Sequence, residues 1–142
     1  MARAEAKEIV NVPIEKFYQV ITDYEKYPEF IKEMTDIEVL EEEDGVKVVE
    51  FHINLMKAVK YSLRLEENNP PSEINWTLVE SDFFKKNDGG WKLEKVDDNT
   101  TEATYFIDCD FKILVPSMIV NSVVRAQLPK MLHSFKERAE SL

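Results

Sequence analysis

Residues 37–111 alternate apolar and polar positions with a period of two, the spacing that places successive side chains on opposite faces of a β-strand. Residues typical of turns divide this region at Asp44-Gly45, Asn68-Asn69-Pro70-Pro71, Asp88-Gly89-Gly90 and Asp97-Asp98-Asn99. The pattern predicts about six consecutive strands in an antiparallel sheet with one apolar face and one solvated face.

Shorter elements precede these strands. Residues 3–10 predict a strand of weak alternation. Pro13 is placed to begin a helix, because its missing N–H costs little in a first turn. The apolar residues of that helix recur at helical spacing: Ile14, Phe17, Tyr18 and Ile21. Residues 25–32 predict a second short helix.

Residues 116–142 predict one long amphipathic helix. Its apolar stripe comprises Val120, Val124, Leu128, Met131 and Phe135. Pro129 lies on the polar side and predicts a kink or local break. At 1.5 Å per residue the helix reaches roughly 40 Å, enough to cross a sheet. An antiparallel sheet with one apolar face needs a cover, and we expect this helix to supply it.

Length and charge restrict the class of protein. The chain has 142 residues, which fits a single domain over residues 1–142. Its net charge of −10, without a basic stripe, disfavours direct binding to nucleic acid or to an anionic membrane surface. We expect a cytoplasmic protein with no transmembrane segment, because the first ten residues lack an apolar signal segment and polar residues interrupt the apolar run at 113–124.

Several short motifs resemble one known family. Residues 23–30, Asp-Tyr-Glu-Lys-Tyr-Pro-Glu-Phe, resemble the D-x-x-x-Y-P-x-F segment of the polyketide cyclase/dehydrase and coenzyme Q-binding branch of the START superfamily. Phe83-Phe84 with Gly90-Trp91 resembles its F…G-x-W stretch, residues 102–111 resemble its penultimate strand, and residues 131–139 resemble its M…F-x-x-R-A helix end. The resemblance covers essentially the whole chain.

The resemblance implies an α+β helix-grip fold of bacterial type, with a curved antiparallel sheet of about seven strands wrapped around the C-terminal helix. It also implies a cavity between sheet and helix for a lipid, quinone or aromatic polyketide. Ligand pockets are lined mainly by apolar and aromatic side chains with few polar groups. On that basis the candidate ligand-binding residues are Phe51, Tyr61, Trp76, Trp91, Tyr105, Asn121, Val124, Arg125 and Leu128.

Asn121 is the candidate polar contact to a ligand. Helical spacing places it on the side of Val124 and Leu128, facing the sheet, with Arg125 at the edge of that side. A buried amide needs a hydrogen bond, which a ligand or water could supply. The alternative is a capping or loop role near the helix start, where Asn is common.

Other chemistry-bearing residues favour structural roles. Asp108 and Asp110 stand two residues apart on one strand face, about 7 Å from each other, but that face is the solvated one. His52 and His133 have no further ligands at metal-binding spacing, so we expect surface histidines and neither metal nor cofactor. Cys109, the single cysteine, falls in the apolar series and is expected to pack as a small hydrophobe.

Three functions stay open. Binding or carriage of an apolar small molecule asks least of the residues. A polyketide aromatase/cyclase would need an acid or base, for which the inward residues offer only Tyr61, Tyr105, Asn121 and Arg125. The third is a protein-interaction module, because some relatives in this branch are described as ribosome-associating toxins. The charge of −10 disfavours a direct contact with RNA and leaves docking on a basic protein open.

Overall fold

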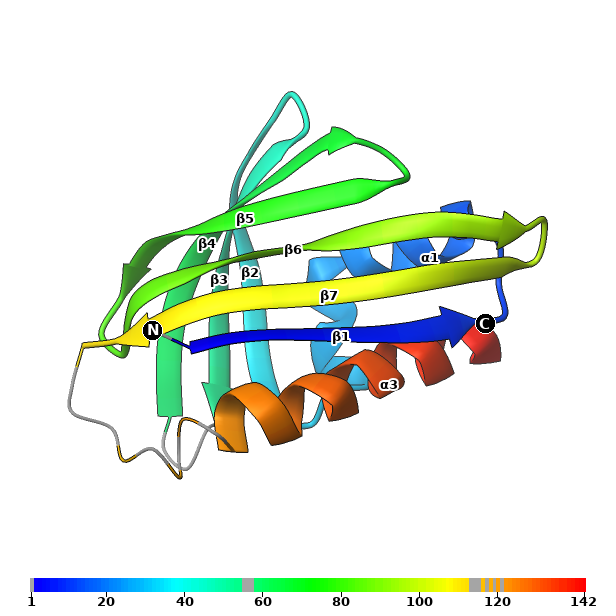
Figure 1. The fold of residues 1–142 in the computed structure, drawn as a ribbon. Helices are drawn as coiled ribbons and strands as arrows, with labels where there is room; N and C mark the ends of the chain where they lie inside the picture. Colours follow the sequence, from blue (N-terminus) through cyan, green and yellow to red (C-terminus); the bar gives the residue numbers. More distant parts are fainter. Residues whose placement is uncertain (1, 55–57, 113–115, 117, 119, 121) are drawn as a thin grey trace.

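The computed structural model describes residues 2–54, 58–112, 116, 118, 120 and 122–142. The chain forms β1 (Ala2–Val10), α1 (Ile14–Thr22), the 3-10 helix η1 (Tyr24–Glu29), β2 (Met34–Glu43), β3 (Val46–Asn54), β4 (Ala58–Asn69), β5 (Glu73–Ser81), β6 (Phe84–Asp97), β7 (Thr100–Phe111), the π-helix η2 (Ser122–Ala126) and α3 (Gln127–Ser141). The seven strands make one antiparallel sheet in the order β1-β7-β6-β5-β4-β3-β2 (Figure 1). The predicted α+β helix-grip architecture is confirmed.

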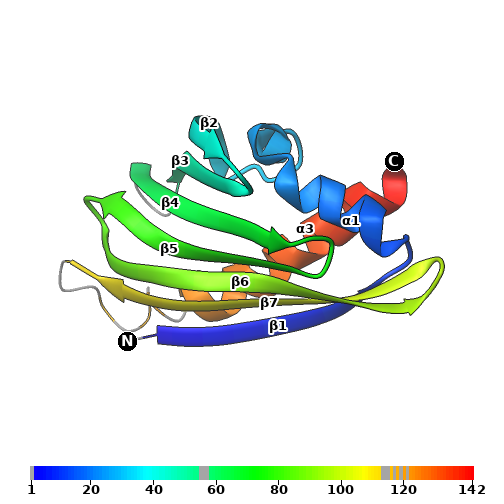
Figure 2. The same cartoon turned by 90° about the horizontal axis from the view of Figure 1, so that it is seen from above.

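The curved sheet and α3 enclose a shared apolar core. Figures 1 and 2 show α3 lying along the concave side of the sheet, with α1 beside its C-terminal part. The residues of α3 that are buried recur at helical spacing: Leu128, Leu132, Phe135 and Ala139. Phe135 is 1% exposed, and its ring meets Tyr27 at 4.9 Å and Trp91 at 5.1 Å, both edge-on. The long helix therefore covers the apolar face of the sheet.

The segment after α1 is shorter and tighter than the predicted helix over residues 25–32. It is a 3-10 helix that ends at Glu29. Pro28 lies inside it and disfavours the α conformation for the preceding residue, Tyr27. Tyr24 and Tyr27 are both buried, so the short helix is held by its aromatic side chains.

The predicted turn at Asp88-Gly89-Gly90 is wrong, because both glycines lie inside β6. A Cβ on Gly89 would meet the ring of Trp76 at 2.7 Å, and a Cβ on Gly90 would meet the carbonyl oxygen of Ile74 at 2.5 Å. Glycine in a strand interior marks such a close approach.

The actual turn between β5 and β6 lies at residues 82–83. Ser81 stabilises this turn, since its hydroxyl oxygen accepts hydrogen bonds from the backbone N–H groups of Phe83 and Phe84, both at 3.0 Å.

The predicted helix over residues 116–142 is interrupted before Pro129. A π-helical turn, η2, precedes α3, and Pro129 is the third residue of α3. Proline has no N–H to donate and its ring crowds the carbonyl four residues earlier, so a local widening at this point relieves the conflict. No described helix is long and apolar enough to cross a bilayer.

Candidate functional site

A cavity of about 120 Å³ lies between α3 and the concave face of the sheet. Its apolar lining is Ile31, Met34, Ile53, Tyr61, Leu63, Phe84, Tyr105, Ile107, Cys109, Leu128 and Met131. Its polar lining is Glu33, Asn87, Gln127, Lys130 and Ser134. A narrower space of about 40 Å³ leads deeper, toward Tyr27, Trp76, Trp91 and Phe135. The two spaces share five lining residues, so they form one continuous candidate site: Met34, Tyr61, Leu63, Tyr105 and Met131.

Packed aromatic rings build the wall on the sheet side. Tyr61 stacks on Phe51, with ring centroids 5.2 Å apart and planes inclined by 13°. Tyr105 is held between Trp76 at 5.2 Å and Trp91 at 4.9 Å. Aromatic pairs prefer offset-stacked or edge-on packing, so each ring restricts the orientation of the ring beside it. The wall is aromatic and pre-formed.

Two tyrosines of this lining have hydroxyls that make no hydrogen bond to a described residue. Tyr61 and Tyr105 are 8% and 9% exposed, and neither hydroxyl makes a hydrogen bond to a residue in the described part of the chain. Burial raises the pKa of both phenols well above the ordinary value, and for Tyr105 the nearby Tyr61 adds to the rise in pKa. Both groups stay protonated at neutral pH and can donate a hydrogen bond.

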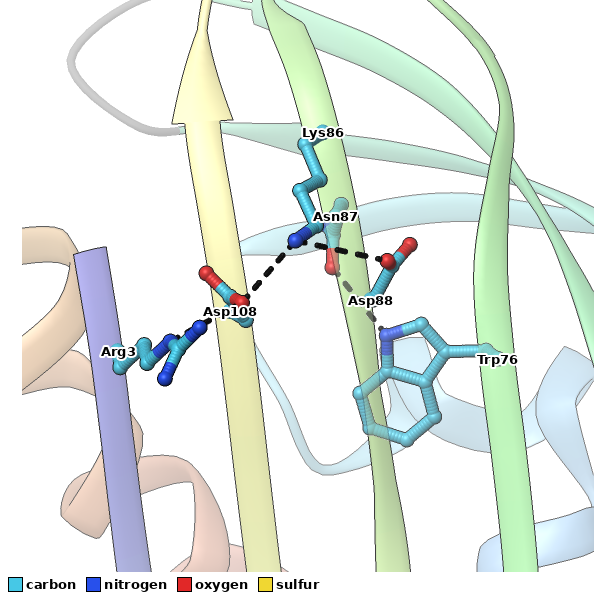
Figure 3. Close-up of polar contacts among 6 residues, drawn as sticks. All are labelled: Arg3, Trp76, Lys86, Asn87, Asp88 and Asp108. Atoms are coloured by element: carbon cyan, nitrogen blue, oxygen red, sulfur yellow. Dashed lines mark hydrogen bonds and ion pairs between the residues drawn. The ribbon is translucent and has the colours of Figure 1, made fainter. Parts of the chain in front are cut away.

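Asn87 brings a buried amide to the same cavity. The indole nitrogen Nε1 of Trp76 donates a hydrogen bond of 3.2 Å to its Oδ1 (Figure 3). Asn87 is 3% exposed and lies on β6, inside the stretch that the sequence predicted to be near a turn. This residue was missed for that reason.

An ion pair spans the exposed end of the cavity. Lys130 on α3 lies 3.6 Å from Glu33, which precedes β2. Gln127, Met131 and Ser134 follow the same face of α3 as Lys130, at spacings of three and four residues. The two charges therefore sit at the rim, while the inner wall is neutral.

Cys109 belongs to the cavity wall. It is 1% exposed, which confirms its predicted burial. Desolvation raises the pKa of its thiol to about 11, and the nearby Asp108 and Asp110 add to the rise. The group is an uncharged thiol at neutral pH and a poor nucleophile.

Asp108 lies on β7 with its carboxylate on the opposite, convex face of the sheet. One of its oxygens is 3.1 Å from Nζ of Lys86 and 3.2 Å from Nε of Arg3 (Figure 3). The hydrogen bond from Lys86 is the main cause that lowers the pKa of this carboxyl group. Asp108 is thus an ion-paired residue of the outer face, as expected, rather than part of the cavity.

The two histidines also lie away from the cavity. His52 Nε2 is 2.8 Å from Glu50, and His133 Nδ1 is 3.0 Å from Glu8 on β1. Within the described ranges, no three His, Cys, Asp or Glu side chains gather closely enough to hold a metal ion.

The structure brings six of the nine candidate ligand-binding residues to the cavity and its deeper extension: Phe51, Tyr61, Trp76, Trp91, Tyr105 and Leu128. Arg125 is exposed and lines a separate surface depression beside Arg3 on β1, outside this site. Asn121 and the side chain of Val124 fall outside the described residues. Besides the two tyrosine hydroxyls, the polar groups of the site come from Asn87, Gln127, Ser134 and the pair formed by Glu33 and Lys130.

The chain is similar to known proteins in sequence and in fold. The ribosome association toxin RatA of Escherichia coli is 22% identical over 134 residues, covering 94% of this chain and 84% of that protein. A START superfamily protein from Mycobacterium smegmatis has a TM-score of 0.85 at 16% identity, covering 98% of this chain and 97% of that one. The Zhui aromatase/cyclase from Streptomyces sp. R1128 has a TM-score of 0.74 at 19% identity, covering 99% and 87%. Residues 10–136 match the model of the family described as polyketide cyclase / dehydrase and lipid transport, and the chain belongs to that family.

Proposed function

We propose that this protein binds and carries an apolar small molecule in the cavity between α3 and the sheet. The observation that carries the proposal is a pre-formed aromatic cavity whose inner polar atoms, the hydroxyls of Tyr61 and Tyr105, have no hydrogen-bond partner among the described residues. Apolar surfaces with a few oriented polar groups are typical of small-molecule sites. The family description, which includes lipid transport, supports the same function.

The chemistry of the wall favours binding over turnover. The two phenols have raised pKa values, so they are poor general bases at neutral pH. The thiol of Cys109 is protonated, and the carboxylate of Glu33 is paired with Lys130 at the rim. We propose carriage without chemical change, and incubation of the ligand with the protein should return the ligand unaltered.

Binding of toluene tests this function directly, because toluene offers one ring and no polar group. A Kd at or below about 1 mM corresponds to roughly 0.6 kcal/mol per carbon, well within the range of small ligands. We expect the parent protein to bind toluene in calorimetric titration. Met131→Trp fills the cavity and should abolish binding, whereas Met118→Trp, at a residue 78% exposed, should leave binding intact.

The outcomes separate clearly. Loss of binding in Met131→Trp alone supports the cavity as the site. Equal binding by the parent and both variants would place toluene elsewhere. No binding by the parent would contradict the proposed function. If no space were present at Met131, the larger side chain would also destabilise the fold by about 1–3 kcal/mol.

A second candidate is association with the ribosome. It is favoured by the name of the E. coli relative, whose match covers 94% of this chain. A net charge of −10 would direct such contact to a basic ribosomal protein rather than to RNA. Sedimentation of the purified protein with ribosomes through a sucrose gradient tests this candidate. Co-sedimentation at low and physiological salt supports it, and absence at both salt concentrations contradicts it.

A further inference from the structure

The inner part of the cavity combines neutral hydrogen-bond donors with aromatic walls. Its two charged lining residues, Glu33 and Lys130, lie at the rim and pair with each other. The inner polar groups are the hydroxyls of Tyr61 and Tyr105 and the amide of Asn87. All three residues are at least nine-tenths buried. A ligand that reaches them meets no described ionised group.

The orientation of the Asn87 amide follows from its partner. An indole N–H can only donate, so the atom of Asn87 that faces Trp76 must be the carbonyl oxygen. The NH₂ group is therefore left as a donor, and it makes no hydrogen bond to any residue that the structure describes. Asn87 lines the cavity, and its NH₂ group is not among the described side-chain atoms that are both shut off from water and unpartnered, so this donor is open to an acceptor atom of a bound molecule.

The two phenols make the same demand. Tyr61 on β4 and Tyr105 on β7 line the same cavity, and their hydroxyls stay protonated at neutral pH. Together with Asn87 they give three donors from three strands toward one space. A carbonyl oxygen accepts two hydrogen bonds, which matches the two hydroxyls, and it carries no charge, whereas a carboxylate would bring an ionised group into a neutral cavity.

The size of the site limits the rest of the ligand. A cavity of about 150 Å³ is known to hold benzene, and this one measures about 120 Å³ with a side space of about 40 Å³. The rings of Tyr61 and Tyr105 line this volume, and Phe51 joins them in the deeper part, so the lining is aromatic and suits an aromatic ligand. This enclosed volume is close to that of one ring with a short substituent, so a second fused ring would have to extend toward the open rim.

Resting on the proposed binding function, we infer that the cavity selects a neutral, single-ring aromatic molecule that carries a carbonyl oxygen, with that oxygen accepting hydrogen bonds from the hydroxyls of Tyr61 and Tyr105. The aromatic ring occupies the space next to the stacked wall, and the rim pair stays outside the contact. The inference names the class of ligand, whereas the proposed function requires only that some apolar molecule binds.

Four probes, each of which differs from acetophenone in one feature or is acetophenone itself, test the inference. Acetophenone has the ring and the carbonyl, ethylbenzene lacks the oxygen, benzoate carries a charge, and 2-acetonaphthone adds a second ring. We expect acetophenone to bind at least as tightly as ethylbenzene, although its carbonyl must be stripped of water, and we expect benzoate and 2-acetonaphthone to bind at least roughly tenfold more weakly. The carbonyl stretching frequency of bound acetophenone should fall below its value in hexane, because a hydrogen-bonded carbonyl is weakened.

Substitutions then locate the contact. Tyr61→Phe and Tyr105→Phe each remove one hydroxyl and should weaken acetophenone binding by roughly three- to tenfold, without weakening ethylbenzene. Tyr18→Phe is the matched control, because the Tyr18 hydroxyl lies outside the cavity lining and also has no partner among the described residues. It should leave both affinities unchanged. The infrared shift of the parent complex gives an answer even where a variant fails to fold.

The inference and the proposed function fail differently. Tighter binding of ethylbenzene than of acetophenone, or an unshifted carbonyl band, overturns the inference and leaves apolar binding in place. Equal binding of 2-acetonaphthone overturns the single-ring limit. If none of the four probes binds, the proposed function fails together with the inference.

Discussion

Glu33 and Lys130 join two distant segments of the chain across the exposed end of the cavity, with 3.6 Å between the carboxylate Oε1 and the ammonium Nζ. Their side chains are 25% and 60% exposed, so solvent weakens the attraction. The pair connects α3 to the segment before β2, which are the two elements that border the opening. We expect this ion pair to slow the entry and release of a bound molecule and to add little to the free energy of unfolding.

Glu33→Gln should therefore change kinetics more than affinity. An exposed ion pair contributes about 1 kcal/mol at most, so dissociation of toluene should accelerate by up to about fivefold, with a similar rise in association. NMR line-shape analysis of the titration measures both rates. Asp98→Asn is the control, since it breaks the 3.0 Å pair with Lys95 at the β6–β7 turn and should leave both rates unchanged. Unaltered rates in Glu33→Gln would show that the pair does not restrict the opening.

Phe135 anchors α3 to the sheet and should dominate the stability of the helix contact. It is 1% exposed and meets Tyr27, Phe30 and Trp91 edge-on. Phe135→Ala should lower the free energy of unfolding by about 3–5 kcal/mol in urea titration. Met118→Ala, at a residue 78% exposed, should change it by no more than about 0.5 kcal/mol. A loss below about 1 kcal/mol for Phe135→Ala is incompatible with α3 covering the core.

Gly89 is required by space rather than by backbone conformation. A Cβ there would meet the ring of Trp76 at 2.7 Å, so Gly89→Ala should cost about 1–3 kcal/mol through overpacking. Gly45 differs, since it has φ +80 in the β2–β3 turn and meets no atom closer than 3.4 Å. Gly45→Asn should be mild, because Asn tolerates this conformation. The prediction is wrong if the two substitutions lower the unfolding midpoint in urea equally.

His133 should make the attachment of α3 to β1 depend on pH. The hydrogen bond with Glu8 is the main cause that raises the pKa of His133, Glu137 adds to it, and Lys136 opposes it. Because the folded pKa lies above the unfolded value of about 6.5, the stabilisation is fully present below pH ~6.5 and disappears as pH rises through the folded pKa. The difference in unfolding free energy between the parent and His133→Gln should therefore shrink from pH 6 to pH 8.

The control for this effect is Glu8→Gln, which removes the main partner of His133. In that background the His133 pKa, followed by NMR of the imidazole signals, should fall toward its ordinary value. A His133 pKa that is the same with and without Glu8 would contradict the assignment.

Much of the fold follows from local patterns in the sequence. The period-two alternation predicts the strands, and Asp44-Gly45 predicts the β2–β3 turn, where φ is 48 at Asp44 and 80 at Gly45. The predicted turn at Gly89-Gly90 was wrong because glycine indicates either a turn or a close approach of neighbours. Only the packed positions of the Trp76 ring and of the backbone oxygens of Phe106 and Ile74 separate the two. Ser81-Asp82, a pair of turn-forming residues, was the better signal.

The period-two alternation also made part of the cavity wall predictable. Phe51, Tyr61, Trp76, Trp91 and Tyr105 all fall on the apolar side of alternating strands, and that side faces α3. The polar groups were not predictable in this way. The place of Asn87 depends on where β6 begins, and the pair of Glu33 with Lys130 joins residues almost a hundred positions apart, which no local periodicity records.

The most direct test of the central claim uses the methionine methyl groups as reporters. Met34 and Met131 line the cavity and its deeper extension, whereas Met118 is 78% exposed. The protein is labelled with ¹³C at the methionine methyls. The signals of Met34, Met118 and Met131 are assigned by single Met→Leu substitutions, and toluene is titrated in. A toluene ring bound in the cavity should shift the Met34 and Met131 signals along one saturable curve, while Met118 stays in place. Saturable binding that leaves Met34 and Met131 unmoved would contradict the account.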